Sequence, residues 1–332
     1  MKKSCDIIIC IWNQLEMTRQ CIDSILQNTK FPYRLILIDN ASDQPTKEYL
    51  ENLAHQWEQN KGQTPKKGVC LLIIRNEENV GNTAAVNQGL SASDAAFVCN
   101  LDNDTLVAEG WLTEMVAMAE SDPLIGMVMP AGGPAAQPKT ETLPDVDEAA
   151  RSLHPRRGQA LEMATVDCYC SLIKREVIHK VGLWDEAYSP GYFDDTDYSR
   201  RVINAGYKLV GARGAYVYHR GGQSFKKNNT RRDAIFTRNR AIYEQRYGVP
   251  KRSLFIVSNP HQETSACIEK VLSIARQANW VTVYLKGSSE PWIKTRHSHL
   301  KVISMSPFLF SLICTMRIFF RRQKKFHVIK RC

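Results

Sequence analysis

At 332 residues the chain is too long for one minimal domain, and its 43% hydrophobic and 23% charged residues are ordinary for a soluble globular protein. Its net charge of +10 is unevenly distributed. Residues 251–332 hold fifteen Lys and Arg against three Glu and no Asp, a net charge of +12. Any argument from charge to a binding partner therefore concerns this last part of the chain.

The N-terminus and the cysteines exclude two classes of segment. The apolar run that follows Lys2 and Lys3 is short and contains Asp6, so it predicts a first strand and not a signal peptide. The ten cysteines include no CxxC pair. Cys168 and Cys170, the closest two, are separated by a single residue, which fits neither a redox motif nor a zinc knuckle. We therefore expect a reduced, cytoplasmic chain.

Apolar, strand-like runs alternate with helical patterns over the first hundred residues. Strands are predicted over 6–12, 35–38, 69–74 and 96–101, and helices over 16–27, 47–59 and 82–90. Near-continuous apolar strands separated by helices predict a parallel sheet covered on both faces. Ligands of such sheets bind beyond the carboxyl ends of the strands. Several polar residues fall at those ends: Asp39, Asn40, Asp102, Asn103 and Asp104.

The middle of the chain breaks this alternation. Residues 130–159 are rich in Pro, Gly and charged residues, and they predict one long loop. Ordered structure is expected again over 164–173. It is followed by a helix near 175–181, a helix over 195–205 ended by Gly206, a strand pair over 208–219 and a helix over 231–246. A first domain over residues 1–250 follows from this pattern.

A second alternation fills residues 251–332. Strands are predicted over 254–258, 280–285, 300–305 and 326–329, and helices over 265–277 and 308–320. Such a short set of parallel strands buries little on its own. We expect a small basic α/β segment, either an incomplete Rossmann-like domain or a membrane-associating tail.

The helix predicted over 308–320 is apolar, contains Arg317 and precedes four basic residues, so it is short for a bilayer span. Three interpretations follow. It is a crossover helix buried in the second segment, an interfacial helix whose basic end meets anionic lipid, or a nucleic-acid-binding element. The last is least favoured, because no recognised nucleic-acid module accompanies the charge.

The first acidic cluster is the sequence Leu-Asp-Asn-Asp-Thr at the end of the fourth strand. Asp102 and Asp104 stand at i and i+2 on an extended segment, so both side chains point to the same side. Two such carboxylates can share one hard divalent cation. The alternative is a polar turn that caps the next element.

The second acidic cluster and a histidine add to this pattern. Asp194, Asp195 and Asp197 stand at a helix start, where the helix dipole favours them, but a capped helix accounts for only one or two acids. A carboxylate held near others has a raised pKa and can act as a base near neutral pH. His219 ends an apolar strand before two glycines, where a ligand could approach; a purely structural histidine is the alternative.

The order of these features resembles the family 2 glycosyltransferases, which have the GT-A fold, over roughly residues 6–246. The matching segments are IIICIWNQLEMTRQCIDSILQNT, LILIDNASDQ, RNEENVGNTAAVNQGL, VCNLDNDTLV (the DxD metal motif), YFDDTDYSRRVINAGYKL and HRGGQS (the HxxGxS motif). This resemblance implies a Rossmann-like α/β fold with a mixed, mostly parallel sheet flanked by helices.

The resemblance also implies roles for individual residues. Nucleotide-binding residues are Asn13, Asp39, Asn79 and Asp102, and the ligands of Mg²⁺ or Mn²⁺ are Asp104 and His219. The catalytic residues are Asp195, which is the base, and Asp194 beside it, which stands where the family usually has Glu. Acceptor-binding residues are Trp184 and Asp185, with core packing as the alternative for Trp184.

The function implied is the inverting transfer of a sugar from a nucleoside-diphosphate sugar to a hydroxyl of a growing glycan or lipid-linked acceptor. This fits polysaccharide or cell-wall biosynthesis in the cytoplasm, with peripheral contact at the anionic inner face of the cell membrane and no nucleic-acid partner. The alternatives are a non-catalytic nucleotide-binding or membrane-associated scaffold, and the N-terminal part of a bifunctional glycosyltransferase.

Overall fold

The computed structural model describes residues 4–59, 69–131, 138, 140–221, 229–260, 265–287, 292–319 and 326–331. The chain divides into two compact units, one comprising Met1–Ala160 and Val166–Tyr243, the other Leu161–Thr165 and Glu244–Cys332. Nothing in the sequence pattern indicated that residues 161–165 belong to the second unit. The cysteines in the described ranges are all free.

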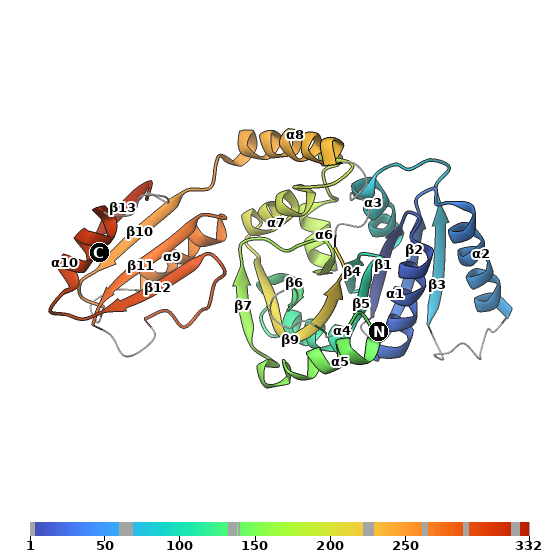
Figure 1. Ribbon diagram of the computed structural model, residues 1–332, viewed down its shortest axis with the longest axis horizontal. Coiled ribbons are helices and arrows are strands. Elements are labelled where there is room, and N and C mark those ends of the chain that lie inside the picture. The colour runs from blue at the N-terminus through green and yellow to red at the C-terminus, as the bar shows by residue number, and fades with distance from the viewer. Residues whose placement is uncertain are drawn as a thin grey trace. The chain divides into compact units, whose positions relative to one another are not determined.

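A mixed sheet with the strand order β3-β2-β1-β4-β8-β6-β9-β5 forms the centre of the first unit (Figure 1). Its strands are β1 (Cys5–Ile11), β2 (Tyr33–Asp39), β3 (Cys70–Arg75), β4 (Phe97–Leu101), β5 (Thr105–Val107), β6 (Ile125–Ala131), β8 (Cys170–Lys174) and β9 (Lys208–His219). The first four strands in the order are parallel, whereas β8 runs antiparallel to both β4 and β6. The predicted mixed, mostly parallel sheet is confirmed.

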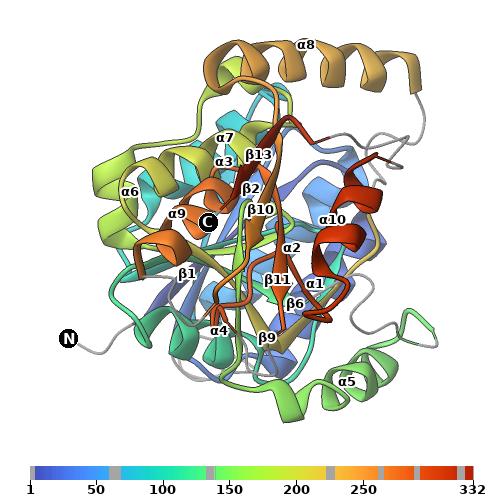
Figure 2. The same cartoon turned by 90° about the vertical axis from the view of Figure 1, so that its left-hand side faces the viewer.

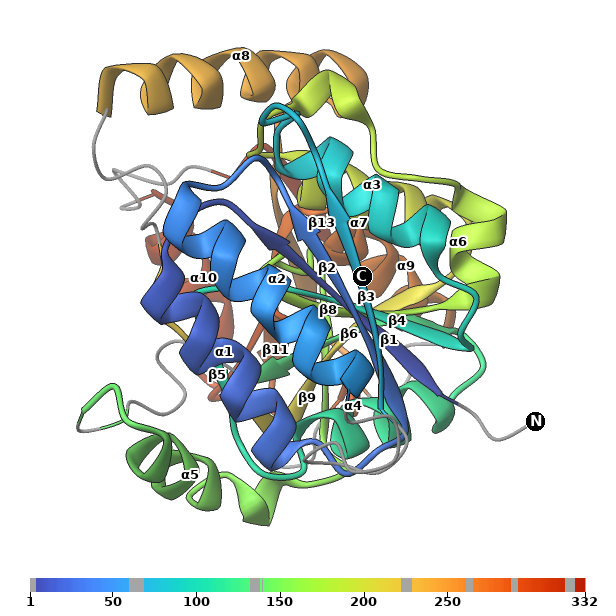
Figure 3. The same ribbon diagram turned by 90° about the vertical axis from the view of Figure 1, so that its right-hand side faces the viewer.

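Helices cover both faces of the parallel strands, as the apolar strand pattern predicted. α1 (Leu15–Asn28) and α2 (Gln44–Gln59) lie on one side, and α3 (Asn82–Ala92) lies on the other (Figure 3). α1 turns Cys21, Ile22 and Ile25 toward the sheet, and all three are fully buried. Further helices are α4 (Trp111–Glu120), α6 (Arg175–Val181), α7 (Asp194–Asn204) and α8 (Asn229–Tyr247), of which the last four residues fall in the second unit.

The strand pair predicted over 208–219 is wrong, because these residues form the single long strand β9. Its first part pairs with β6 in parallel, and its last part pairs with β5 in antiparallel orientation. In this register His219 lies opposite Thr105. One continuous strand therefore carries the histidine to the acidic turn between β4 and β5.

The long loop predicted over 130–159 is also wrong in part, because it contains α5 (Leu143–Arg151) and the short 3-10 helix η2 (His154–Arg156). Pro144 stands in the first turn of α5, where a missing N–H costs nothing. Val146 and Ala150 are buried, and they pack with Leu106 and Tyr216 at one end of the sheet. The many Pro, Gly and charged residues of this segment predicted a loop, and the short amphipathic helix within it was therefore missed.

The second unit contains a parallel sheet with the order β12-β11-β10-β13. Its elements are β10 (Arg252–Val257), α9 (Ser265–Arg276), β11 (Trp280–Lys286), β12 (Leu300–Met305), α10 (Phe310–Phe319) and β13 (Val328–Arg331). In chain order these strands read 3-2-1-4, which is the order of the first part of a doubly wound fold. The short strand β7 (Ala160–Met163) pairs with β9 and so belongs to the first sheet.

Alternation along β10 explains how this sheet is covered on both faces. Phe255 and Val257 pack with residues of α9, and Leu254 and Ile256 pack with α10 on the opposite face (Figure 2). α10 therefore packs as the crossover helix that one of the three sequence interpretations predicted.

Residues 161–165 join the second unit through backbone and ionic contacts. The Glu162 N–H donates to the Arg296 carbonyl and the Ser298 N–H donates to the Glu162 carbonyl, each at 2.8 Å. The buried Glu162 carboxylate also forms an ion pair with Arg276 of α9. A buried carboxylate is stable only with such a partner, so this pair ties the segment to the second sheet.

Candidate active site

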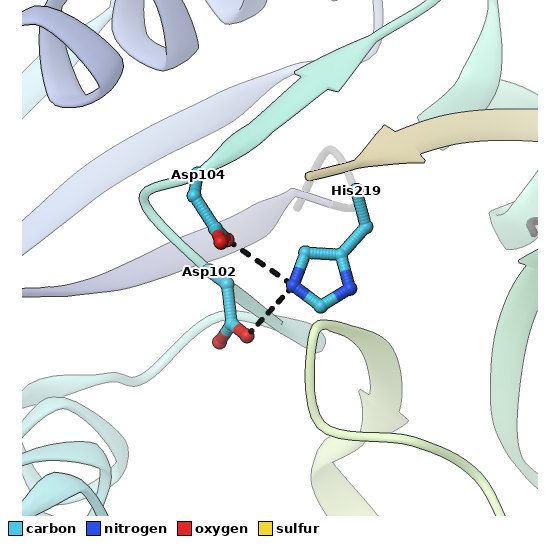
Figure 4. Close-up of side chains that lie close together, drawn as sticks. All are labelled: Asp102, Asp104 and His219. Atoms are coloured by element: carbon cyan, nitrogen blue, oxygen red, sulfur yellow. Dashed lines mark ion pairs between the residues drawn. The ribbon is translucent and has the colours of Figure 1, made fainter. Parts of the chain in front are cut away.

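The carboxyl ends of β4 and β9 bring Asp102, Asp104 and His219 together (Figure 4). The His219 Nε2 atom lies 3.2 Å from an Asp104 oxygen and 3.6 Å from an Asp102 oxygen. Asp104 is buried, while Asp102 and His219 are partly exposed. The three side chains thus form one compact cluster that solvent and a ligand can reach.

Backbone and side-chain bonds fix the acidic turn in this geometry. The Asp102 carbonyl accepts from the Thr105 hydroxyl at 2.8 Å, and the Arg220 N–H donates to the Asp104 carbonyl at 3.1 Å. Asn103 turns away from the cluster and donates to the Thr18 hydroxyl of α1 at 2.9 Å. The turn therefore presents only its two carboxylates to His219.

The electrostatics of the cluster reflect three ionisable groups in one place. Burial, followed by the charge of Asp104, raises the pKa of Asp102 to about 7. For His219 burial acts to lower the pKa, but the hydrogen bond to Asp104 and the surrounding carboxylates outweigh it, and the pKa is raised. A positive charge is thus favoured between the two carboxylates.

This donor set fits a divalent cation. One ligand atom from each of Asp102, Asp104 and His219 can be chosen so that all three lie within 4.8 Å of one another. Carboxylate oxygens suit Mg²⁺ and Mn²⁺, and imidazole is a frequent ligand of transition metals. A bound cation would also offset the repulsion that raises the pKa of Asp102.

In the second acidic cluster, the neighbouring carboxylates of Asp194 and Asp195 lie in different environments. Asp194 is buried and accepts from the Thr83 hydroxyl of α3 at 3.1 Å. Asp195 is half-buried and accepts from the Cys168 N–H at 3.3 Å. Burial, and then the charges of Asp194 and Asp167, raise the pKa of Asp195 to about 7. Of these two carboxylates, only Asp195 combines access to solvent with the proton affinity of a base.

The predicted nucleotide-binding residues lie at the ends of β1 and β2 and in the segment before α3. Asp39 is buried, accepts from the Ser42 N–H at 2.9 Å and forms an ion pair with Arg75. The Asn13 N–H donates to the Ser42 hydroxyl at 2.9 Å, so Asn13 and Asp39 share this partner. Asn79 accepts from the Gly81 N–H at 2.9 Å and so shapes the segment that leads into α3.

The two residues expected to bind the acceptor have structural partners. Trp184 is only 3% exposed, and its ring stacks on Tyr198 with centroids 5.5 Å apart. This is the core packing that the sequence analysis gave as the alternative. The buried ring offers no exposed face on which a sugar could stack. Asp185 accepts from the Ala187 N–H at 2.9 Å and so caps the 3-10 helix η3 (Glu186–Tyr188).

A comparison with protein families identifies the chain. Residues 6–182 match the sequence model of Glycosyl transferase family 2, and these residues make up more than half of the chain. The chain is a family 2 glycosyl transferase. The matched residues include the acidic turn between β4 and β5, and they end before Asp195 and His219.

Curated relatives share part of this glycosyl transferase. The glycosyltransferase AglE of Haloferax volcanii is 24% identical over 212 residues, which are 61% of this chain and 62% of AglE. The poly-beta-1,6-N-acetyl-D-glucosamine synthase of Staphylococcus aureus (strain COL) is 24% identical over 183 residues, 54% of this chain and 41% of the synthase. The chain thus spans less than two thirds of either relative.

Solved structures show that the fold is similar to that of GT-A glycosyltransferases. The mannosyltransferase PcManGT from Pyrobaculum calidifontis, in complex with GDP-Man and Mn²⁺, superimposes with a TM-score of 0.54 at 16% identity, covering 73% of this chain and 64% of that one. GalNAc-T7 with UDP, GalNAc and Mn²⁺ gives a TM-score of 0.52 at 18% identity, covering 65% of this chain and 44% of that one.

Three residues that the sequence did not single out connect the two acidic clusters of this glycosyl transferase. Asn100, at the end of β4, donates to the Cys168 carbonyl at 2.6 Å, and the Cys168 N–H in turn reaches Asp195. Tyr169 stacks on His219 with centroids 4.7 Å apart, and its carbonyl accepts from the Asp102 N–H at 2.8 Å. The polar Asn100 inside an apolar strand was the one available sequence signal.

Proposed function

We propose that this chain is an inverting, metal-dependent glycosyl transferase that moves a sugar from a nucleoside-diphosphate sugar to a hydroxyl of a growing glycan or lipid-linked acceptor. One observation carries the proposal. A three-residue cation site and a half-buried carboxylate with the pKa of a base stand at the same edge of the sheet, joined through Cys168 and Tyr169.

In the proposed reaction Asp195 takes the proton of the acceptor hydroxyl as its oxygen attacks the anomeric carbon. The bond from that carbon to the diphosphate oxygen breaks, and the nucleoside diphosphate leaves with the electron pair. Asp102, Asp104 and His219 would hold Mg²⁺ or Mn²⁺, and the bound cation would supply Lewis-acid stabilisation of the diphosphate. Attack opposite to the leaving group inverts the configuration at the anomeric carbon.

Separate residues are assigned to the nucleoside. We place the base beside Asp39 and Asn13 at the ends of β2 and β1, with Asn79 shaping the adjacent segment. This assignment agrees with the rule that ligands of open α/β sheets bind beyond the carboxyl ends of the strands. The HxxGxS motif adds His219 to this edge, but its Gly222, Gln223 and Ser224 lie outside the described residues.

A donor panel tests the proposed activity. UDP-, GDP- and dTDP-sugars are incubated with the full chain, with Mn²⁺ or with EDTA, and release of the nucleoside diphosphate is measured. We expect release from one class of donor, and we expect chelation to abolish it. A donor that raises the unfolding midpoint in the presence of Mn²⁺ without any release under any condition would favour the non-catalytic scaffold instead.

We place the proposed reaction in polysaccharide or cell-wall synthesis in the cytoplasm. The similarity to a poly-beta-1,6-N-acetyl-D-glucosamine synthase supports this setting. None of the helices in the described ranges combines the length and the apolar character needed to span a membrane.

We further propose that the second unit contacts the anionic inner face of the membrane through α10 and the turn before it. Phe308, Leu312 and Met316 recur every four residues and are 97%, 58% and 48% exposed. They belong to the part of the chain with a net charge of +12. An apolar stripe on a basic segment matches an anionic lipid surface.

Vesicle binding tests this contact. The full chain and the variant Phe308→Ser/Leu312→Ser/Met316→Ser are sedimented with phosphatidylcholine vesicles with and without phosphatidylglycerol. We expect the variant to bind anionic vesicles at least ~10-fold more weakly, since full burial of one such side chain contributes about 1.5–3 kcal/mol. Val249→Ser, which removes another exposed apolar side chain, is the control. Equal binding of the triple variant would exclude the contact.

A further inference from the structure

The turn that leads into the second acidic cluster has an unusual backbone. Tyr192 and Phe193 both have φ of 68°, in the left-handed region that costs a residue with a side chain about 1 kcal/mol or more. The next two residues are Asp194 and Asp195, at the start of α7. Such a conformation persists only where surrounding contacts hold it, so the contacts that hold this turn also decide where Asp195 points.

One buried side chain supplies three of those contacts. The Asn239 amide, on α8, donates to the carbonyl oxygens of Tyr188 at 2.7 Å, Gly191 at 2.8 Å and Tyr192 at 3.0 Å. Asn239 is fully buried, and in Figure 1 its helix lies above α7. Three carbonyls of one turn thus converge on a single amide group, far along the chain from the turn itself.

Two other side chains of α8 also contact the turn. Arg238 donates its guanidinium to the Ser189 carbonyl and to the Asn239 side-chain oxygen, which orients the amide. The ring of Phe236 packs against the rings of Tyr192 and Phe193, at 5.8 Å and 5.2 Å between centroids. Side chains of α8 therefore hold the turn in two ways: they donate hydrogen bonds to its backbone carbonyl oxygens, and they pack against its aromatic rings.

The other side of the turn meets the segment before α3. The Asn82 N–H donates to the Pro190 carbonyl at 3.3 Å. Gly81 lies so close that an added Cβ would stand 2.4 Å from the Ser189 hydroxyl. The turn is thus fixed between α3 and α8, and a loss of the α8 contacts would leave it held on one side only.

We propose that Asn239 is a positioning residue for glycosyl transfer: by holding the turn over Tyr188–Phe193 in its left-handed form, it aims the Asp195 carboxylate at the acceptor hydroxyl. This inference rests on the proposed function, because it takes Asp195 as the base. Asn239 itself touches neither the cation site nor the predicted nucleotide-binding residues.

The test is the variant Asn239→Ala in the full chain, compared with Thr237→Ala, an exposed position on the same helix. We expect kcat to fall ~10²-fold, since a base displaced by about 1 Å loses that much. KM for the donor should stay within ~2-fold, because the residues predicted to bind the nucleotide are untouched. The acid limb of the kcat profile should also move to lower pH, since a loosened turn hydrates Asp195 and reverses the burial that raises its pKa.

A role in stability alone would give a different pattern. If the thermal unfolding midpoint shows that Asn239→Ala is folded, and the variant keeps the wild-type kcat and the acid limb of its pH profile, the inference is wrong. It is also wrong if kcat, donor KM and the unfolding midpoint all deteriorate together with the acid limb unmoved.

Two further variants separate the remaining outcomes. If Asn239→Ala does not fold, Arg238→Ala decides, because it removes an exposed partner of the same turn. A several-fold loss of kcat with a shifted acid limb supports the inference, and an unchanged enzyme overturns it. Asp195→Asn tests the proposed function separately from the positioning role. If Asp195→Asn transfers sugar at the wild-type rate, the assignment of Asp195 as the base is wrong. If Asp195→Asn is inactive while Asn239→Ala is fully active, only the positioning role of Asn239 is wrong.

Discussion

Asp195→Asn is expected to lower kcat for sugar transfer by about 10³-fold, within the 10²–10⁴ that a positioned general base contributes. Asn keeps the shape of the side chain and can still accept the Cys168 N–H, but it cannot take a proton at neutral pH. Donor binding should be unchanged, because none of the predicted nucleotide-binding residues contacts Asp195. Transfer assays at saturating donor, with donor binding measured by calorimetry, separate the two effects.

The pH profile adds an independent expectation for Asp195. Its pKa is raised to about 7, first by burial and then by Asp194 and Asp167, and the base works only when ionised. The kcat of the wild type should therefore fall as the pH drops below about 7. The residual rate of Asp195→Asn should lack this limb, and a limb that persists unchanged in the variant would assign the titration to another group.

Asp194→Asn is the matched control for this prediction. Its side-chain oxygen can still accept from the Thr83 hydroxyl, and Asp194 is buried away from solvent. We expect less than ~10-fold loss of kcat, because Asp194 does not itself take the proton of the acceptor. Should Asp194→Asn be inactive while Asp195→Asn remains active, the roles of the two carboxylates are exchanged.

The two acidic clusters differ in how much of their arrangement a local sequence pattern can predict, because the interactions involved differ in range. Asp102 and Asp104 share a side because the alternation of an extended strand is local. Asp194 and Asp195 are adjacent in the chain, and what distinguishes them is their partners, Thr83 and Cys168, which are far away in sequence. A local pattern could propose both acids but could not choose between them.

The same reasoning explains the errors in the fold. Near-continuous apolar runs located the parallel strands, because β1, β2 and β4 are buried along nearly all their length, while the edge strand β3 is only partly buried. The apolar pattern divided β9 wrongly, since that strand changes its partner from β6 to β5 along its length. It also missed the role of Asn239, whose three carbonyl partners lie about fifty residues earlier in the chain.

Removal of the Asp104 carboxylate should strongly weaken both Mn²⁺ binding and sugar transfer. Asp104→Asn takes away the negative charge that lies 3.2 Å from the His219 ring nitrogen. We expect Mn²⁺ affinity to fall at least ~10²-fold and kcat/KM to fall with it, because Lewis-acid stabilisation of a leaving group is worth several kcal/mol. Calorimetric titration of Mn²⁺ into the protein, followed by transfer assays over a range of Mn²⁺ concentrations, measures both quantities.

Asn103→Ala is the control for Asp104→Asn, because Asn103 lies between the two acids yet bonds to Thr18 on α1. It should keep wild-type Mn²⁺ affinity to within a few-fold. Equal Mn²⁺ affinity in Asp104→Asn and the wild type would remove the cation from this cluster.

The Mn²⁺ affinity of the wild type should also depend on pH. Without the metal, the pKa of Asp102 is about 7 and that of His219 is raised, and a ligand must lose its proton to bind. Affinity should therefore rise between pH 6 and pH 8, with release of protons in the titration. Asp104→Asn removes the negative charge that favours protonated His219, so its residual binding should show a weaker dependence on pH. The same dependence in both proteins would mean that the protons come from groups outside the cluster.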